Sequence, residues 1–222
     1  MIQAAIAEIP NGASVMLGGF GVPGTPFCLI DELVRQGQTG LTIIKNDANE
    51  TGMGVDHLLK NAQVARLITT HIGLNARAIE MMNAGDLKVE FCAQGILAER
   101  IRTAGAGLHG FLTDIAMDTE LGEGKHRIEI DGRVSMVETA LKADFALLHA
   151  EGADPFGNLV YAATARNFNP LMAMAATQVI AETETLLPIG AIDPNHVHTP
   201  GPFVDKVVTL TGLTKEYAVV QR

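Results

Sequence analysis

Carboxamide side chains stand just past the ends of two apolar segments of strand length. Asn46 follows the segment 41–44, and Gln94 follows the segment 87–92. A neutral amide can donate a hydrogen bond to the oxyanion that forms when a carbonyl group is attacked, so both residues are candidate donors for acyl transfer. Two other interpretations stay open: Asn46 forms a turn, or Gln94 satisfies the backbone at the start of a helix.

A glycine-rich segment, residues 18–26, lies between a predicted strand at 14–17 and a predicted helix at 26–36. Its glycines permit positive φ and close approach of backbone N–H groups to a ligand, and Pro26 suits the first helical turn. In open parallel sheets ligands bind outside the carboxyl ends of the strands, where this segment lies. The spacing is not the dinucleotide G-x-G-x-x-G pattern, and a tight strand-to-helix turn is the alternative.

Elements of strand length alternate with segments of helical periodicity along most of the chain. This rhythm is typical of right-handed βαβ units on a parallel sheet. The pattern predicts helices at 26–36, 55–60, 79–84 and 96–104, and strands at 14–17, 41–44, 64–69, 87–92, 144–149, 159–161, 179–181 and 207–210.

The rhythm breaks at the polar segment 113–125. Residues 127–130 and 133–137 then predict a β-hairpin, because Asp131-Gly132 is a favoured turn between two strands. We therefore expect an α/β fold: a mostly parallel open sheet flanked by helices, with a small antiparallel excursion. No internal repeat divides the chain, so residues 1–222 are expected to form one domain.

The composition excludes several classes of partner. The net charge of −9 disfavours nucleic acid and anionic membranes. Charged residues make up 18%, against roughly 25% in typical domains, which indicates either an apolar face that a partner covers or a well-buried core. No basic residue precedes Arg35 and no apolar run is long enough to cross a membrane, so we expect a cytoplasmic protein.

The remaining candidates for chemistry are weaker. Cys28 and Cys92 are far apart and predict neither a disulfide nor a metal site. His71 follows a predicted strand, but a loop histidine is the better interpretation. His196 and His198 lack a third ligand nearby, so no metal site is predicted.

Several blocks of the sequence, in order and over about residues 9–208, resemble the coenzyme A transferase family. The segment 11–20 with Gly24 and Pro26 is similar to the N-terminal signature of that family. The later matching blocks are Leu41–Asp47, Gln94-Gly95 with Leu97–Arg102, Gly105–Gly107, Asp154 with Gly157-Asn158, Ala165–Pro170, and His198–Gly201 before Phe203-Val204.

The resemblance implies an alpha subunit of a two-subunit transferase, which moves CoA between acids by a ping-pong mechanism. The nucleophilic glutamate of such enzymes belongs to the beta subunit, in a Ser-Glu-Asn-Gly motif that this chain lacks; Glu151-Gly152 is the nearest counterpart. The expected partner is thus a beta subunit, in a heterodimer or an α2β2 assembly. CoA and acyl-CoA are expected as substrates, with no permanently bound cofactor.

The resemblance also assigns roles to residues of this chain. It places Asn46 and Gln94 where the family contacts the acyl group, and it implies substrate or CoA binding by Phe20, Gly21, Gly24, Asp47 and Gly95. The pair Asn46-Asp47 is more similar to the acetate and acetoacetate branch than to the succinate-using branch. Short acids such as acetate, butyrate or acetoacetate are therefore expected.

One segment departs from the family pattern. Residues 114–119 read Asp-Ile-Ala-Met-Asp-Thr where many relatives have a glycine-containing loop, which leaves the acid specificity open. A sugar-phosphate-sensing or isomerase-like domain of a related α/β fold is the alternative function. A sensor of that kind usually adjoins a DNA-binding segment, and no basic helix-turn-helix stretch is visible.

Overall fold

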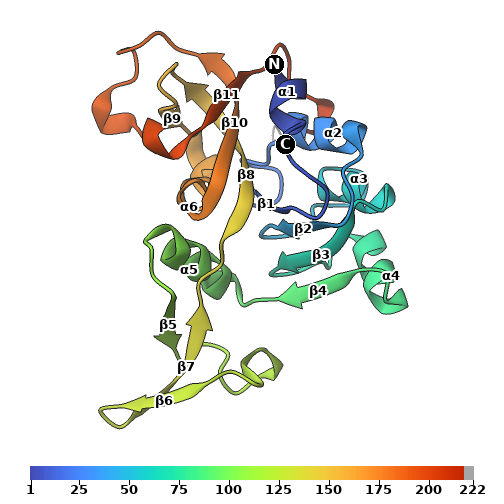
Figure 1. Cartoon of the computed structure of the whole chain (residues 1–222), viewed down its shortest axis with the longest axis vertical. Helices are drawn as coiled ribbons and strands as arrows, with labels where there is room; N and C mark the ends of the chain where they lie inside the picture. Colours follow the sequence, from blue (N-terminus) through green and yellow to red (C-terminus); the bar gives the residue numbers. More distant parts are fainter. Residues whose placement is uncertain (218–222) are drawn as a thin grey trace.

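A computed structural model describes residues 1–217 and shows a parallel sheet with a smaller antiparallel sheet beside it (Figure 1). The strand order of the main sheet is β11-β10-β8-β1-β2-β3-β4, and each of these neighbouring pairs is parallel. The short β9 joins β8 in the antiparallel direction. The predicted fold class is confirmed.

The main sheet contains β1 (Ser14–Leu17), β2 (Leu41–Ile44), β3 (Val64–Thr69), β4 (Lys88–Phe91), β8 (Ala143–Ala153), β9 (Leu159–Val160), β10 (Ala176–Leu186) and β11 (Lys206–Thr209). The α-helices are α1 (Ile2–Ile6), α2 (Phe27–Gln36), α3 (Val55–Lys60), α4 (Ala76–Ala84), α5 (Gln94–Gly105) and α6 (Asn169–Ala175).

Two apolar cores lie on the two faces of this sheet. Residues of α1, α2, α3 and α4 pack into one core, and residues of α5 and α6 pack into the other. Both faces are covered, which agrees with the apolar sequences of the central strands β1 (SVML) and β2 (LTII). Among the described residues, no helix has the length and apolar character that a membrane span requires.

The antiparallel sheet consists of β5 (Gly110–Thr113), β7 (Arg133–Thr139) and β6 (Arg127–Ile130), in that order. It stands out from the lower end of the molecule in Figure 1. Asp131 and Gly132 have φ values of 52° and 75°, so the predicted hairpin turn is confirmed. The single domain at 1–222 stays a prediction, and residues 218–222 lie outside the described range.

Three elements were not predicted from the sequence. The helices α1 and α6 are too short for a clear periodic signal, and β5 is a four-residue strand that ends where the predicted polar break begins, at Thr113. The strands β8 and β10 are also longer than predicted, because they pair with each other along most of their length. The helix α4 begins earlier than predicted, since the Asn75 side chain caps it by accepting from the Ala78 amide.

Candidate active site

The glycine loop, residues 18–26, connects β1 to α2 at the carboxyl edge of the main sheet, as predicted. Gly21 and Gly24 have φ values of +60° and +79°, which residues with a side chain rarely adopt. The helix begins at Phe27, so Pro26 is the residue before its first turn rather than within it. The positive φ expected of the loop glycines is confirmed at both positions.

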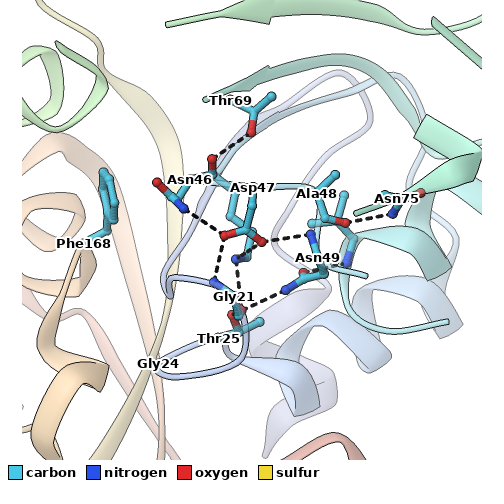
Figure 2. A network of polar contacts seen from close by, with 12 residues as sticks. Gly21, Gly24, Thr25, Asn46, Asp47, Ala48, Asn49, Thr69, Asn75 and Phe168 are labelled. Carbon is cyan, nitrogen blue, oxygen red and sulfur yellow. Dashed lines mark hydrogen bonds and ion pairs between the residues drawn. The ribbon is translucent and has the colours of Figure 1, made fainter. Parts of the chain in front are cut away.

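Asp47 is the centre of a hydrogen-bond network beside this loop (Figure 2). Its carboxylate accepts from the Gly21 amide at 2.8 Å, the Asn49 amide at 2.9 Å and the Asn46 side-chain nitrogen at 3.0 Å. The Lys45 ammonium lies 3.2 Å away. Burial favours the neutral acid, but the Lys45 charge and these hydrogen bonds outweigh it and lower the pKa of Asp47 to about 2.

The orientation of Asn46 follows from the charge of Asp47. An ionised carboxylate only accepts hydrogen bonds, so the Asn46 nitrogen faces Asp47 and its side-chain oxygen faces away. That oxygen accepts from the Gln94 Nε2 at 2.9 Å. The fully buried Asn46 and the exposed Gln94 are therefore in direct contact. Each amide nitrogen carries two hydrogens, so each retains a second N–H after these bonds.

The predicted binding residues do not all line one cavity. Phe20, Gly21 and Asp47 border a pocket of about 110 Å³ together with His71. Gly95 is exposed beside Gln94 at the start of α5 and lies outside this pocket. The remaining lining residues are Val22, Ala48, Asn49, Glu50, Met53 and Leu74.

Gly24 is buried on the other side of the loop. A Cβ atom at this position would lie 2.4 Å from the Ala165 carbonyl oxygen and 2.6 Å from the Asn169 side-chain nitrogen. Asn169 also donates to the Gly24 carbonyl at 3.1 Å, and Asn167 donates to the Pro23 carbonyl at 2.9 Å. The loop therefore packs tightly here, and the substrate-binding role of Gly24 stays a prediction.

The sequence analysis gave no individual role to Asn167, Asn169 or Lys45. The two asparagines support the glycine loop, and the start of a helix at Asn169-Pro170 was the available signal. Lys45 is fully buried, and its ammonium also lies 3.5 Å from the Gly21 carbonyl. Burial lowers the pKa of Lys45 while Asp47 opposes that shift. A lysine at the end of an apolar strand was the only signal for this ion pair.

Sequence comparison identifies the family. The model for coenzyme A transferase matches residues 1–210. The chain belongs to the coenzyme A transferase family. The prediction from the motifs is thereby confirmed, and the transferase is favoured over the sugar-phosphate alternative.

Two relatives and one solved structure illustrate the similarity to known transferases. A probable coenzyme A transferase subunit alpha from Bacillus subtilis is 46% identical, covering 98% of this chain and 95% of the relative. The acetate CoA-transferase subunit alpha of Escherichia coli K12 is 39% identical, covering 93% of this chain and 94% of the relative. The fold is shared with an acyl-CoA transferase from E. coli O157:H7, which was solved as a thioester complex with CoA. The TM-score is 0.84 at 21% sequence identity, and the match covers 96% of this chain and 47% of that chain.

Other polar residues of this transferase chain have structural contacts. The His198 Nδ1 accepts from the Tyr161 amide at 3.0 Å. The Asp154 carboxylate accepts from the Phe156 and Asn158 amides and so forms a turn. His71 Nδ1 lies 3.0 Å from the Thr70 hydroxyl. These contacts agree with the interpretation of His71 and His198 as loop residues.

One cluster in the transferase fold has side chains of the kind that bind metal ions. Ligand atoms of Asp31, His57 and Glu216, from α2, α3 and the C-terminal segment, lie within 4.8 Å of one another. His57 and Glu216 form an ion pair at 3.1 Å when the histidine is protonated. Burial and the charge of Glu216 raise the pKa of Asp31 to about 6. The sequence analysis did not identify this cluster.

The departing segment 114–119 lies next to the antiparallel sheet. Arg127 donates to the Met117 carbonyl at 2.8 Å and to the Asp118 carboxylate at 3.1 Å, which ties the segment to β6. Residues just after it border a cavity of about 500 Å³ that Phe91 and Cys92 also line. Cys92, on the wall of this cavity, stands two residues before α5 begins at Gln94.

Proposed function

We propose that this chain is the alpha subunit of an acyl-CoA:carboxylate CoA-transferase that acts on short acids such as acetate, butyrate or acetoacetate. The observation that carries the proposal is the contact between the Gln94 and Asn46 amides at the carboxyl edge of the sheet. The names of the relatives, which are alpha subunits of CoA-transferases, support it. CoA and acyl-CoA are the substrates, no cofactor is permanently bound, and the assembly works in the cytoplasm.

The reaction begins with a glutamate carboxylate on a beta subunit. Its oxygen attacks the thioester carbonyl of acyl-CoA, and the tetrahedral intermediate collapses to a mixed anhydride and CoA thiolate. The thiolate then attacks the glutamyl carbonyl, which forms a glutamyl-CoA thioester and releases the first acid as a carboxylate. A second acid carboxylate takes the CoA by the reverse steps, which regenerates the glutamate.

This chain supplies a hydrogen-bond donor to the tetrahedral intermediates. The second N–H of the exposed Gln94 is the donor to the oxyanion in this proposal. Asn46 is fully buried, so it acts through its side-chain oxygen, which holds the Gln94 amide, and Asp47 orients Asn46 in turn. Phe20, Gly21 and Asp47, which border one pocket, are the proposed wall of the acyl site, and Gly24 and Gly95, which lie outside that pocket, are proposed to contact other parts of the substrate or CoA. The low pKa of Asp47 keeps it ionised at neutral pH, so it is an acceptor and not a proton donor.

A beta subunit completes the site, in a heterodimer or an α2β2 assembly. The Ser-Glu-Asn-Gly motif is absent from this sequence. The match to the solved acyl-CoA transferase covers 47% of that chain, which supports a second polypeptide that provides the other part.

The isolated chain is expected to have no exchange activity, and the beta subunit is expected to restore it with parallel initial-rate lines. Incubation with acyl-CoA followed by borohydride should reduce a glutamyl thioester, and mass spectrometry should locate the lesion on the partner. Glu151, which is exposed on β8, is the matched control, and Glu151→Gln should leave exchange unchanged. Turnover by the isolated chain, or a lesion at Glu151, would contradict the proposal.

A further inference from the structure

The C-terminal segment of the described chain returns to the beginning of α2. The Tyr217 hydroxyl accepts from the Phe27 amide at 3.1 Å and lies 3.0 Å from the Thr25 carbonyl oxygen. The preceding Glu216 pairs with His57 of α3 at 3.1 Å. Two consecutive residues near the end of the chain therefore hold the segment against the helix that follows the glycine loop.

The first turn of α2 depends on side chains from outside the helix. Pro26, the residue before the helix, makes no side-chain cap. The Tyr217 hydroxyl accepts from Phe27, and the Glu182 carboxylate accepts from the Leu29 amide at 2.8 Å. The first amides of a helix have no partner within it, so these two acceptors add to the local bond from the Phe27 amide to the Thr25 carbonyl at 3.0 Å.

The phenol of Tyr217 is held in place by neighbours on several sides. Its ring lies 5.1 Å from the Phe27 ring and 4.8 Å from the His149 ring. Its hydroxyl contacts the Glu182 carboxylate, and burial together with that charge raises the pKa of Tyr217. The hydroxyl therefore stays neutral and keeps its single proton for an acceptor.

Thr25, whose carbonyl oxygen lies beside this hydroxyl, is linked by hydrogen bonds to the candidate oxyanion donors. The Thr25 side chain donates to the Gly21 carbonyl at 2.7 Å, and the Gly21 amide donates to Asp47. Asp47 orients Asn46, which accepts from Gln94.

We propose that Tyr217 is a positioning residue of this transferase, whose hydroxyl holds the glycine loop in the geometry that orients Asp47, Asn46 and Gln94. The inference rests on the proposed function of these residues. It predicts that loss of the hydroxyl alone loosens the loop and slows the transfer step, although Tyr217 lies outside the pocket that Gly21 and Asp47 line.

The test compares Tyr217→Phe with Tyr161→Phe in the complex with the beta subunit. Tyr161 is the other tyrosine of the chain, is buried, and makes a hydroxyl bond to Thr199 at 2.8 Å. Each variant keeps the ring and loses one buried hydroxyl, so the chemical change is the same, and the two differ in the neighbours that lose a partner: Phe27, Thr25, His149 and Glu182 for Tyr217, and Thr199 for Tyr161. Turnover is expressed per trapped thioester, which removes inactive protein from the comparison, and amide hydrogen exchange is followed in residues 18–26.

Tyr217→Phe is expected to lower turnover per trapped thioester about tenfold or more and to speed exchange in the loop. Tyr161→Phe should leave both unchanged. Equal turnover and equal hydrogen exchange in the two variants would overturn the proposal. A Tyr217→Phe chain that fails to fold or assemble would also overturn it, because the hydroxyl would then be needed for folding and not for positioning the loop. If the wild-type complex exchanges no CoA, the proposed function fails, while hydrogen exchange still decides whether Tyr217 holds the loop.

Discussion

Replacing Gln94 by leucine removes one candidate oxyanion donor and keeps most of the side-chain volume. The loss of such a donor typically reduces turnover by about 10²–10³, which corresponds to about 3–4 kcal/mol of transition-state stabilisation. The structural cost is smaller. Among the described residues, Gln94 makes one side-chain hydrogen bond, to Asn46, and leaving that buried oxygen unpaired costs about 1–3 kcal/mol of folding free energy.

The assay measures kcat for CoA exchange in the assembled complex, together with the denaturation midpoint. We expect a large fall in kcat, a modest fall in stability and no loss of assembly. Gln36→Leu is the matched control, because Gln36 ends α2 and donates to the Gln3 carbonyl and Glu32. That variant loses comparable hydrogen bonds away from the glycine loop and should keep normal kcat. A Gln94→Leu complex that retains more than about half of the wild-type turnover would remove Gln94 from the mechanism.

Four further predictions concern the loop and its surroundings. Gly24→Val should lower the melting temperature sharply, because the valine side chain would overlap the backbone that packs against the loop. Gly21→Ala is the control: its Cβ would meet open space, so it should lower the free energy of unfolding by only about 1 kcal/mol. Asp47→Ala should reduce the unfolding free energy by about 3–5 kcal/mol, since it leaves Lys45 buried without a counter-charge; equal urea midpoints would contradict this. The pKa of Asp47 is about 2 in the folded protein, below its ordinary value of 3.8, so its contribution to stability should be lost as the pH falls from about 4 towards 2. Urea unfolding at a series of acidic pH values measures this loss. Burial and nearby acids raise the pKa of Cys28 to about 12, so native protein should react slowly with iodoacetamide at pH 8 and denatured protein quickly; equal rates would refute the burial argument.

Local patterns were sufficient for most of the parallel sheet. The segments 14–17, 41–44 and 64–69 are strands at the predicted bounds, because each is a short apolar run next to a loop or helix signal. The hairpin turn was equally predictable, because Asp-Gly favours a two-residue turn, and Asp131 and Gly132 both adopt positive φ in the structure. The short helix α6 escaped prediction, because one apolar stretch of that length fits a strand or a buried helix equally well.

The candidate donors were predictable because their position depends on strand order alone. In a parallel sheet the carboxyl ends of neighbouring strands lie at one edge, so residues after β2 and β4 were expected at the same edge of the sheet. The direct bond between Asn46 and Gln94 was not predictable, because it depends on the side-chain orientation that Asp47 imposes. The structural role of Gly24 was also hidden, since it depends on packing against residues more than a hundred positions away in the chain.

The sequence by itself determined the family, the fold class and the loop that follows the first strand, because these are written in contiguous motifs and local periodicity. Tertiary structure alone decided how the loop is held. Lys45 beneath Gly21, Asn169 behind Gly24 and Tyr217 at the start of α2 come from separate parts of the chain. Hydrogen bonds act over about 3 Å, so such contacts exist only where folding brings distant segments together, and no local pattern records which segments those will be.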